Sequence, residues 1–460
     1  MSPPRPAKGH PRSEPRARSR RVPHHARHGA RRVPDGLTVS GVGIVIGAGI
    51  YVLIGHAATQ AGNAVWLSFG LAAVLSVFTG LSYAELAGMY PSSGAEFEFA
   101  RRAFNPFIGF LAGWAMVAGN VVAAAAVAIG FGHYLGGFLA IDVRVGAGGL
   151  LLGLTAIICL GVQRSIWLST VLALVQVGGL IIVVVAGAPH LGAYPLLEGA
   201  TTGGVLAGAA LVFFAFIGFD EVVTLSDETR DPARVVPIAL LLALGISTLL
   251  YVLVGIAAVS LVGGAALAGS DRPLALALAH DWGDGAAALV SGIALASTTN
   301  TTLLVLTAAS RLLYGMARAG ALPPMLAHLS GRNLVPRRAA VVALLCALPL
   351  AATGSIGLVA AATDFLVYAI FLVVNGAVIA LRFRAPSVQR QFRAPLHLRA
   401  LPLTPVAGLL TVALMMAYLD RGALLLGLAL LLPAVAVWLL PGESRRRQAL
   451  DASGAAGRTT

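Results

Sequence analysis

Charged residues are scarce in this chain of 460 residues. Asp, Glu, Lys and Arg together form 11% of the sequence, about half the share of a typical soluble domain. Hydrophobic residues form 58%, and the mean hydropathy is +0.85. This composition excludes an ordinary soluble protein and predicts a polytopic membrane protein.

Cysteine and the residue groups of catalytic sites are nearly absent as well. Cys159 and Cys346 are the only cysteines, and both lie in apolar segments, which excludes a disulfide framework and argues against a cysteine metal site. The sequence has no metal-binding cluster of His, Asp and Glu, no Ser–His pairing and no G-x-x-x-x-G-K-[ST] phosphate loop. We therefore expect no enzymatic activity, no metal, no cofactor and no ATP-driven pump.

Positive charge gathers at the N-terminus, where residues 1–34 hold ten basic residues and four histidines. No apolar stretch of signal-peptide type precedes the first long apolar segment. Residues 1–35 are therefore expected to form a disordered, basic cytosolic tail. Attraction to anionic lipids, at about 1 kcal/mol per basic residue, is an alternative to a plain solvated tail. The net charge of +13 follows the membrane topology, so no nucleic-acid partner is expected.

Long apolar segments are abundant. About twenty apolar residues cross a bilayer, and the sequence predicts twelve transmembrane helices joined by short loops. The predicted segments are 36–60, 65–88, 107–135, 146–162, 167–188, 203–225, 236–262, 286–315, 339–354, 357–381, 402–419 and 422–440. An even number of crossings places both termini on the same side of the membrane.

The orientation follows from the excess of Lys and Arg in cytoplasmic loops. With the N-terminus inside, 29 of the 32 basic residues fall on the inner side. The other three, Arg144, Arg272 and Arg421, each lie within two residues of an aspartate. We expect a multi-pass protein of the cytoplasmic membrane with cytosolic N- and C-termini.

The first apolar segment contains the glycine-rich stretch V-G-I-V-I-G-A-G-I-Y-V-L, Val42 to Leu53. Glycine costs roughly 1 kcal/mol in a helix interior relative to alanine, so this stretch predicts a break in the helix. At membrane depth, freed main-chain groups are tolerated where they line a cavity or are covered by protein. The functional interpretation is a substrate site made of main-chain groups. Close helix packing through small residues is the alternative.

A second interrupted stretch, L-V-F-F-A-F-I-G-F-D, runs from Leu211 to Asp220 in the sixth predicted helix. If the first ten helices form two five-helix halves, the first and sixth helices occupy matching places and cross in opposite directions. Paired interruptions of this kind are the best sequence indication of a transporter's midplane binding site.

Several motifs carry a resemblance to a known family. They are G-A-G-I-Y from Gly47, L-S-Y-A-E-L from Leu81, F-F-A-F-I-G-F-D from Phe213, S-R-L-L-Y-G-M-A-R-A-G-A-L-P-P from Ser310 and Q-F-R-A-P-L from Gln391. Together they resemble the amino acid–polyamine–organocation superfamily, and most of all its bacterial cationic-amino-acid-transporter-like branch, over about residues 36–440.

The resemblance implies an all-α membrane fold with the five-plus-five inverted repeat of the leucine transporter. Helices 1 and 6 are then discontinuous, and helices 11 and 12 are additional. It implies repeats at 36–200 and 201–400, helices 11 and 12 at 401–440 and a cytosolic tail at 441–460. It also implies secondary active transport of amino acids by alternating access, with exchange of amino acids, amines or polyamines as the alternative.

Two broken helices offer main-chain groups that can bind both charged groups of an α-amino acid. N–H groups at the helix start near Gly47 to Gly49 are expected to bind its carboxylate, and open carbonyls are expected to accept from its ammonium. By the resemblance Phe214 closes over the substrate, although packing or lipid contact would also explain it, and Asn120 faces the substrate or bonds another helix. The predicted substrate-binding residues are Ile44, Val45, Gly47, Ala48, Gly49, Asn120, Phe214, Ala215, Phe216 and Ile217.

The predicted gating or coupling residues are Phe214, Asp220, Gln176, Asp364, Glu85 and Arg311. Acids at membrane depth are functional candidates because their charge is expensive there. Glu85 and Arg311 are candidates for an inner-gate ion pair that involves Asp220, Glu221 or Asp227, or they are ordinary interfacial charges.

Two departures from the family pattern bear on the substrate. By the resemblance, Gln176 stands where proton-coupled members carry a lysine, and Gly119 where an acid is expected. These departures lead to the hypothesis of a small or neutral amino acid, moved by exchange or coupled through Asp220 or Asp364. The expected partners are this substrate, the lipid bilayer and a proton or counter-substrate, whereas the oligomeric state is not predicted.

Overall fold

The computed structural model describes residues 42–43, 45–90, 95–161, 166–220, 232–330, 334–398 and 401–439, which belong to one compact unit. The predicted basic tail (1–35), the C-terminal tail (441–460), Ile44, Glu221 and Asp227 lie outside these residues.

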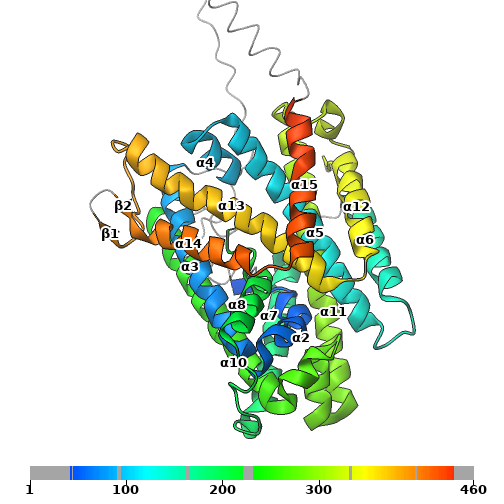
Figure 1. The fold of residues 1–460 in the computed structure, drawn as a ribbon. Helices are drawn as coiled ribbons and strands as arrows, with labels where there is room; N and C mark the ends of the chain where they lie inside the picture. The colour runs from blue at the N-terminus through cyan, green and yellow to red at the C-terminus, as the bar shows by residue number, and fades with distance from the viewer. Residues whose placement is uncertain are drawn as a thin grey trace, which may run out of the picture. The chain divides into compact units, whose positions relative to one another are not determined.

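The described chain is almost entirely helical (Figure 1). Its α-helices are α2 (Gly49–Ala61), α3 (Val65–Met89), α4 (Ala95–Ala103), α5 (Pro106–Leu135), α6 (Val143–Leu160), α7 (Ile166–Gly187), α8 (Thr202–Val212), α10 (Pro232–Ala268), α11 (Pro273–Arg318), α12 (Arg337–Ala351), α13 (Ile356–Arg384), α14 (Leu403–Ala417) and α15 (Arg421–Leu439). Short 3-10 helices are η1 (Gly62–Ala64), η2 (Ala188–His190), η3 (Phe213–Phe216) and η5 (Pro324–Ala327). Strands β1 (His397–Leu398) and β2 (Leu401–Pro402) pair antiparallel, with His397 opposite Pro402.

Eight stretches of the described chain are long and apolar enough to cross a membrane. One of them, Gly49–Met89, contains both α2 and α3. Thr202–Phe216 and Leu403–Ala417 are shorter apolar helices. The prediction of a polytopic helical membrane protein is confirmed, whereas the count of twelve helices and the inverted repeat stay predictions.

One helix lies outside the predicted apolar segments. The amphipathic α4 contains Glu96 and Glu98 in its first turn and Arg101 and Arg102 in its last turn. Acids near the N-terminus and bases near the C-terminus complement the helix dipole. Phe99, which is 1% exposed, attaches this short helix to the rest of the protein.

Helix α5 runs through the middle of the bundle and packs against α11 on one side and α13 on another (Figure 1). Alanines and glycines along α5 allow close approach, as is common between membrane helices. Helix α13 is joined to α3 by a buried polar cluster. Asn375 donates to the Thr79 hydroxyl at 3.0 Å and accepts from the Ser82 hydroxyl at 2.7 Å.

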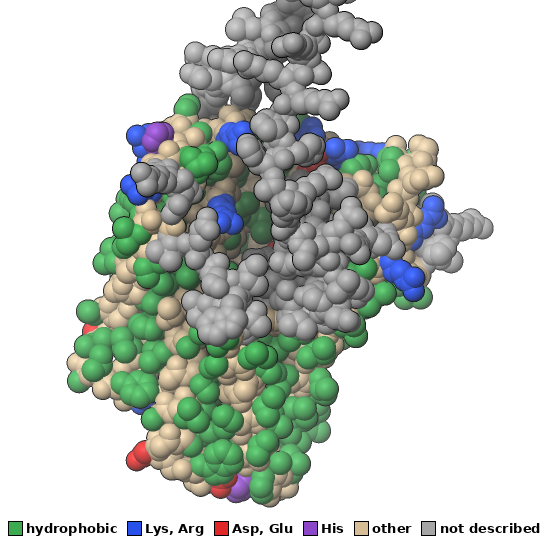
Figure 2. All heavy atoms as spheres, turned by 180° about the vertical axis from the view of Figure 1, so that it is seen from behind, with side chains coloured by type: hydrophobic (Ala, Val, Ile, Leu, Met, Phe, Trp, Pro, Cys, Tyr) green, Lys and Arg blue, Asp and Glu red, His purple; other side chains and the backbone are tan. Residues whose placement is uncertain are grey.

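The outer surface agrees with a membrane protein. Figure 2 shows a broad hydrophobic surface with arginines gathered toward one end of the face in view. Large apolar side chains of α10 such as Leu242 and Leu249 are 49% and 63% exposed. Exposed apolar area of this extent is typical of a surface that meets lipid or another protein.

Candidate functional site

The first helix is interrupted where its glycines predict a break. Residues 46–48 form a bend, and α2 begins at Gly49. The Gly47 N–H donates to the Val45 carbonyl at 2.8 Å, and the Ala48 N–H lies 3.3 Å from the Thr301 hydroxyl of α11. The first N–H groups of α2 have no partner within the helix, as at every helix start.

The sixth predicted helix is interrupted as well. Helix α8 ends at Val212, η3 covers Phe213–Phe216, and a turn follows at Ile217 and Gly218. Gly218 has a φ of 115°, a conformation that glycine adopts without steric strain. Its N–H donates to the Asp220 carboxylate at 3.1 Å.

The two breaks lie side by side. A Cβ added to Gly49 would lie 2.6 Å from the Ala215 Cα, so only glycine permits this approach. The Tyr251 hydroxyl of α10 lies 2.9 Å from the Val45 carbonyl and 3.0 Å from the Ala215 carbonyl. Main-chain groups of both interruptions therefore meet at one place in the protein.

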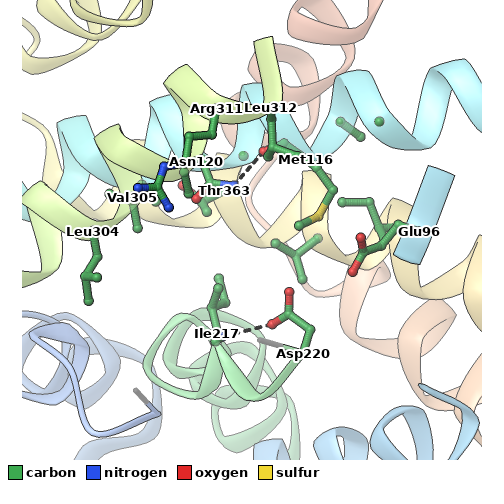
Figure 3. Close-up of a pocket in the computed structure, with 18 of the residues that line it drawn as sticks. Glu96, Met116, Asn120, Ile217, Asp220, Leu304, Val305, Arg311, Leu312 and Thr363 are labelled. Carbon is green, nitrogen blue, oxygen red and sulfur yellow. Dashed lines mark hydrogen bonds between the residues drawn. The ribbon is translucent and has the colours of Figure 1, made fainter. Parts of the chain in front are cut away.

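A cavity of about 700 Å³ begins at the breaks. Its walls include Gly47, Ile217 and Gly218 together with side chains of α5, α11 and α13 (Figure 3). Along α11 the lining extends from Asn300 to Ala319, which is about 28 Å at 1.5 Å per residue. The cavity thus leads from the breaks toward the end of the bundle where α11 finishes.

On the other side of the breaks the protein is tightly packed. The Tyr51 hydroxyl of α2 donates to the Gln176 carbonyl at 2.6 Å, and the Tyr134 hydroxyl of α5 donates to the Tyr51 carbonyl at 2.7 Å. A Cβ on Gly130 would lie 2.6 Å from a Val52 methyl. Contacts this close pack α2 tightly against its neighbours, and the described lining of the cavity extends from the breaks toward the end of α11.

Neutral polar groups line the cavity near the breaks: Gln176, Asn120, Thr301 and Thr363. The Gln176 side chain is 1% exposed, and neither its oxygen nor its nitrogen has a hydrogen-bond partner in the described part of the chain. Asn120 donates to the Met116 carbonyl of its own helix at 2.9 Å (Figure 3), so its oxygen remains available as an acceptor. These amides and hydroxyls offer hydrogen bonds to a ligand but no counter-charge to a charged side chain of that ligand.

Charged groups also line the cavity. Asp220 lies at the second break, where its carboxylate accepts from the Gly218 N–H, and Arg311 lies farther along α11. Asp220 and Glu96 lie on one side of the view in Figure 3, away from Leu304, and Arg311 lies across the cavity from Asp220. Among the described residues no ion pair joins Arg311 to Asp220 or to another acid. Asp220 and Arg311 are therefore opposite charges on facing walls.

Glu85 is in an ion pair, with partners that the sequence did not indicate. Its carboxylate is 1% exposed and accepts from Arg382 of α13 at 3.0 and 2.6 Å. Arg390 lies 3.4 Å away, and the Ala394 N–H donates at 2.8 Å. This network links α3 to α13 and the segment after it. Glu85 does not line the cavity. Among the described residues no ion pair joins Glu85 or Arg311 to Asp220, and an inner-gate pair that involves Glu221 or Asp227 stays a prediction, because both lie outside the described residues.

Other predicted site residues lie behind the cavity wall. Val45, Ala48 and Gly49 are buried at the first break, and Phe214, Ala215 and Phe216 are buried at the second. The Phe216 ring packs edge-on to Tyr251, with 5.2 Å between ring centroids. The closing role of Phe214 stays a prediction. Asp364 is fully buried beside the cavity rather than in its lining.

Sequence reasoning missed Tyr251, Thr301, Thr363 and the partners of Glu85. A hydroxyl-bearing aromatic in the otherwise apolar 236–262 segment was a usable signal for Tyr251, because a buried Tyr hydroxyl normally has a hydrogen-bond partner. The pairing of Glu85 with Arg382 joins residues 297 positions apart, and no local pattern predicts it.

Known proteins share this sequence pattern. A sequence model described as amino acid permease matches residues 36–434. The branched-chain amino acid permease BcaP of Bacillus subtilis is 29% identical over 392 residues, which cover 78% of this chain and 82% of the relative. The methylthioribose transporter of the same organism is 30% identical over 393 residues (80% and 84%). The vacuolar cationic amino acid transporter 2 of Arabidopsis thaliana is 32% identical over 385 residues (77% and 60%).

Proposed function

This chain belongs to the amino acid permease family and is a transporter rather than an enzyme, and from that premise we propose that it moves an α-amino acid with a neutral, apolar side chain. The substrate binds where the two breaks meet and passes by alternating access. The observation that carries the proposal is the uncharged lining of the cavity at Gly47, Gln176, Asn120, Thr301 and Thr363.

The two charged groups of an amino acid have separate sites in this proposal. The carboxylate lies at the start of α2, where N–H groups that have no acceptor within the helix and the helix dipole favour an anion. The ammonium lies at the carbonyls of the second break, around Ile217. Gly47 and Gly218 have no side chains and let the substrate reach the main chain.

The side chain of the substrate points to the α5 and α13 walls. Ala123, Thr363 and Val367 offer apolar and small surfaces there, and Gly119 supplies no counter-charge for a cationic side chain. The relatives include a branched-chain amino acid permease, a cationic amino acid transporter and a methylthioribose transporter. The neutral lining favours a substrate with a neutral, apolar side chain, such as a branched-chain amino acid.

The same premise supports the finer topology. We propose twelve crossings of the cytoplasmic membrane, with repeats at 36–200 and 201–400, helices 11 and 12 at 401–440 and cytosolic tails at 1–35 and 441–460. The matched breaks before α2 and after α8 support the repeat. The concentration of arginines beside inner loops supports cytosolic termini. In this orientation the cavity opens to the cytosol.

Uptake into proteoliposomes tests the substrate. Radiolabelled L-leucine should enter in a saturable manner, and excess unlabelled valine or alanine should suppress its entry. Arginine and lysine should compete weakly because their side chains are positively charged. Methylthioribose should compete weakly because it is not an amino acid. Lysine or arginine that competes better than alanine at low concentration would refute the neutral-substrate proposal.

A second candidate, obligate exchange, is favoured by one observation. Gln176 is a neutral amide buried in α7 and supplies no proton of its own. If the protein is an exchanger, leucine uptake requires amino acid or amine inside the vesicle. Uptake into empty vesicles separates the two modes.

A further inference from the structure

Asp364 of α13 is a buried acid that the substrate site does not use. Its side chain is 0% exposed. Within the described chain neither carboxylate oxygen has a hydrogen-bond partner, in contrast to Glu85, whose carboxylate has three donors. A carboxylate without donors or a counter-charge is strongly destabilised in an apolar surrounding. The group is therefore neutral in this state and holds a proton.

The position of Asp364 on α13 places it between two functional faces. Thr363 and Val367 line the cavity. Tyr368, one turn after Asp364, donates its hydroxyl to the Ala210 carbonyl of α8 at 3.0 Å. At 100° per residue, Asp364 lies between the cavity face and the Tyr368 face of the helix. The carboxyl is thus next to the cavity and next to the half-helix that ends at the second break.

Charged groups on the neighbouring elements are distant or already paired. Helices α8, η3 and α14, which pack on α13, contain no titratable side chain. Tyr51 of α2 and Tyr134 of α5 donate to main-chain carbonyls, and His133 of α5 lies 3.5 Å from Asp271. Of the remaining groups, Tyr83 packs against Phe371, about 10 Å along α13 from Asp364, and Asp220 lines the cavity next to Phe219, whose ring also packs on Phe371. The others on the packed elements are His56, Arg421, Glu85, Glu96, Glu98, Arg101 and Arg102.

The separations along α13 are large. Arg421 precedes Gly422, which lies against Leu358, about 9 Å along the helix from Asp364. The His56 ring lies against Gly357, about 10 Å away by the same rise. Glu85 is bound to Arg382, about 27 Å away. No basic side chain is therefore placed to hold Asp364 as an anion.

We propose that Asp364 carries the proton that drives transport, so that the protein is a proton–amino acid symporter. This inference rests on the proposed transport function and names the coupling residue. The carboxyl takes up one proton from outer water when the opposite state exposes it. It holds that proton while it is buried, and it releases it as hydronium to water in the cavity beside Thr363. Movement of α8 against Tyr368 is the step that changes its exposure.

The test uses the full-length protein in proteoliposomes with radiolabelled L-leucine as the probe. Wild type should accumulate leucine above equilibrium when the outside is acidic. D364N, which mimics the neutral form permanently, should lose this accumulation and retain leucine–leucine exchange. D420N is the matched control, because Asp420 caps α15 through the Gly422 N–H and asparagine caps nearly as well. It should behave like wild type.

A second measurement does not depend on the substrate. The infrared carbonyl band of a protonated, buried carboxylic acid should be present in wild type and D420N and missing from D364N. Together these results would support the proposal. Accumulation by D364N at the wild-type level, loss of exchange together with accumulation, or absence of the band in wild type would each overturn it.

The two proposals fail in different ways. Wild type that exchanges leucine but never accumulates it under a pH gradient would overturn coupling through Asp364 and leave amino acid transport intact. Wild type that shows the band but neither accumulates nor exchanges leucine would overturn both the proposed neutral substrate and the symport. Uptake of lysine or methylthioribose into the same vesicles would then identify the substrate that the protein moves instead.

Discussion

The two sides of the breaks are held together in different ways. On the side of α2, the contacts next to the breaks are neutral: tyrosine hydroxyls bound to main-chain carbonyls and glycines packed against neighbouring atoms. On the side toward which the cavity leads, charged groups dominate, including the Glu85–Arg382 pair and the Glu98 pairs with Arg101 and Arg102. A barrier deep in the membrane has no water to solvate charge, whereas a side near water is free to use it.

This difference predicts which substitutions destabilise the protein on each side of the breaks. Neutral contacts in a dry interior depend on shape, so they fail when an atom is added or removed. Ion pairs depend on burial, so the same Glu-to-Gln change should be severe at Glu85 and mild at Glu98. The following changes separate these cases.

The largest effect is expected for E85Q. Removing the carboxylate leaves Arg382 and Arg390 as buried charges, with side chains only 10% and 4% exposed, and breaking a buried pair costs about 3–5 kcal/mol. Thermal unfolding of the detergent-purified protein, followed by tryptophan fluorescence, should show a large drop in midpoint. An E85Q midpoint equal to that of E98Q would contradict the role assigned to burial.

Next comes Gly49→Ala. The added methyl would lie 2.6 Å from the Ala215 Cα, and overpacking of this kind costs about 1–3 kcal/mol. Leucine uptake should be lost because the two breaks are forced apart. Gly153→Ala is the matched control, since no atom lies within 4 Å of the corresponding position. If both variants transport equally, the close approach of the breaks is not required.

A smaller effect is expected for Tyr51→Phe. The change removes one hydrogen bond on the side of α2, worth about 0.5–1.5 kcal/mol, and leaves the ring in place. The midpoint of thermal unfolding should fall slightly. Substrate-free leak of a small solute through the reconstituted protein should rise. Tyr314→Phe serves as the control, because the described chain gives the Tyr314 hydroxyl no hydrogen bond. Equal leak in both variants would count against a sealing role of Tyr51.

The smallest effect concerns pH and the exposed α4 pairs. The hydrogen bond from Arg101, followed by that from Arg102, lowers the pKa of Glu98. A lowered carboxylate pKa contributes stability above the unfolded-state pKa, and this contribution is lost as pH falls through the folded-state pKa. The exposed pair should contribute under about 1 kcal/mol. Acid titration of E98Q and wild type should therefore converge at low pH; divergence there would contradict the assignment.

The fold could be predicted to a large extent because its signals are local. Apolar runs located the helices, and the glycines of Val42 to Leu53 located the first break, since glycine weakens a helix wherever it occurs. The short α4 escaped prediction because its stability comes from Phe99 and from helix-end charges rather than from an apolar run.

The site could be predicted only in part. Gly47, Ile217, Asn120, Gln176, Asp220 and Arg311 all line the cavity, but Phe214 and Phe216 are buried outside its lining. Which aromatic faces a cavity depends on the neighbours it meets, such as Tyr251 against Phe216 and Tyr368 against Phe213. Those neighbours come from helices far along the chain, so the local sequence around the phenylalanines does not predict these contacts.

The Tyr251 hydroxyl has one hydrogen and two carbonyl neighbours, Val45 and Ala215. At any moment it serves one of them. If transport separates the two segments, as we propose, the phenol can keep its bond to one of them, and the other loses only a bond that it already shared. Such a movement would leave the Tyr251 hydroxyl bonded throughout, which would keep the energetic barrier low at this point.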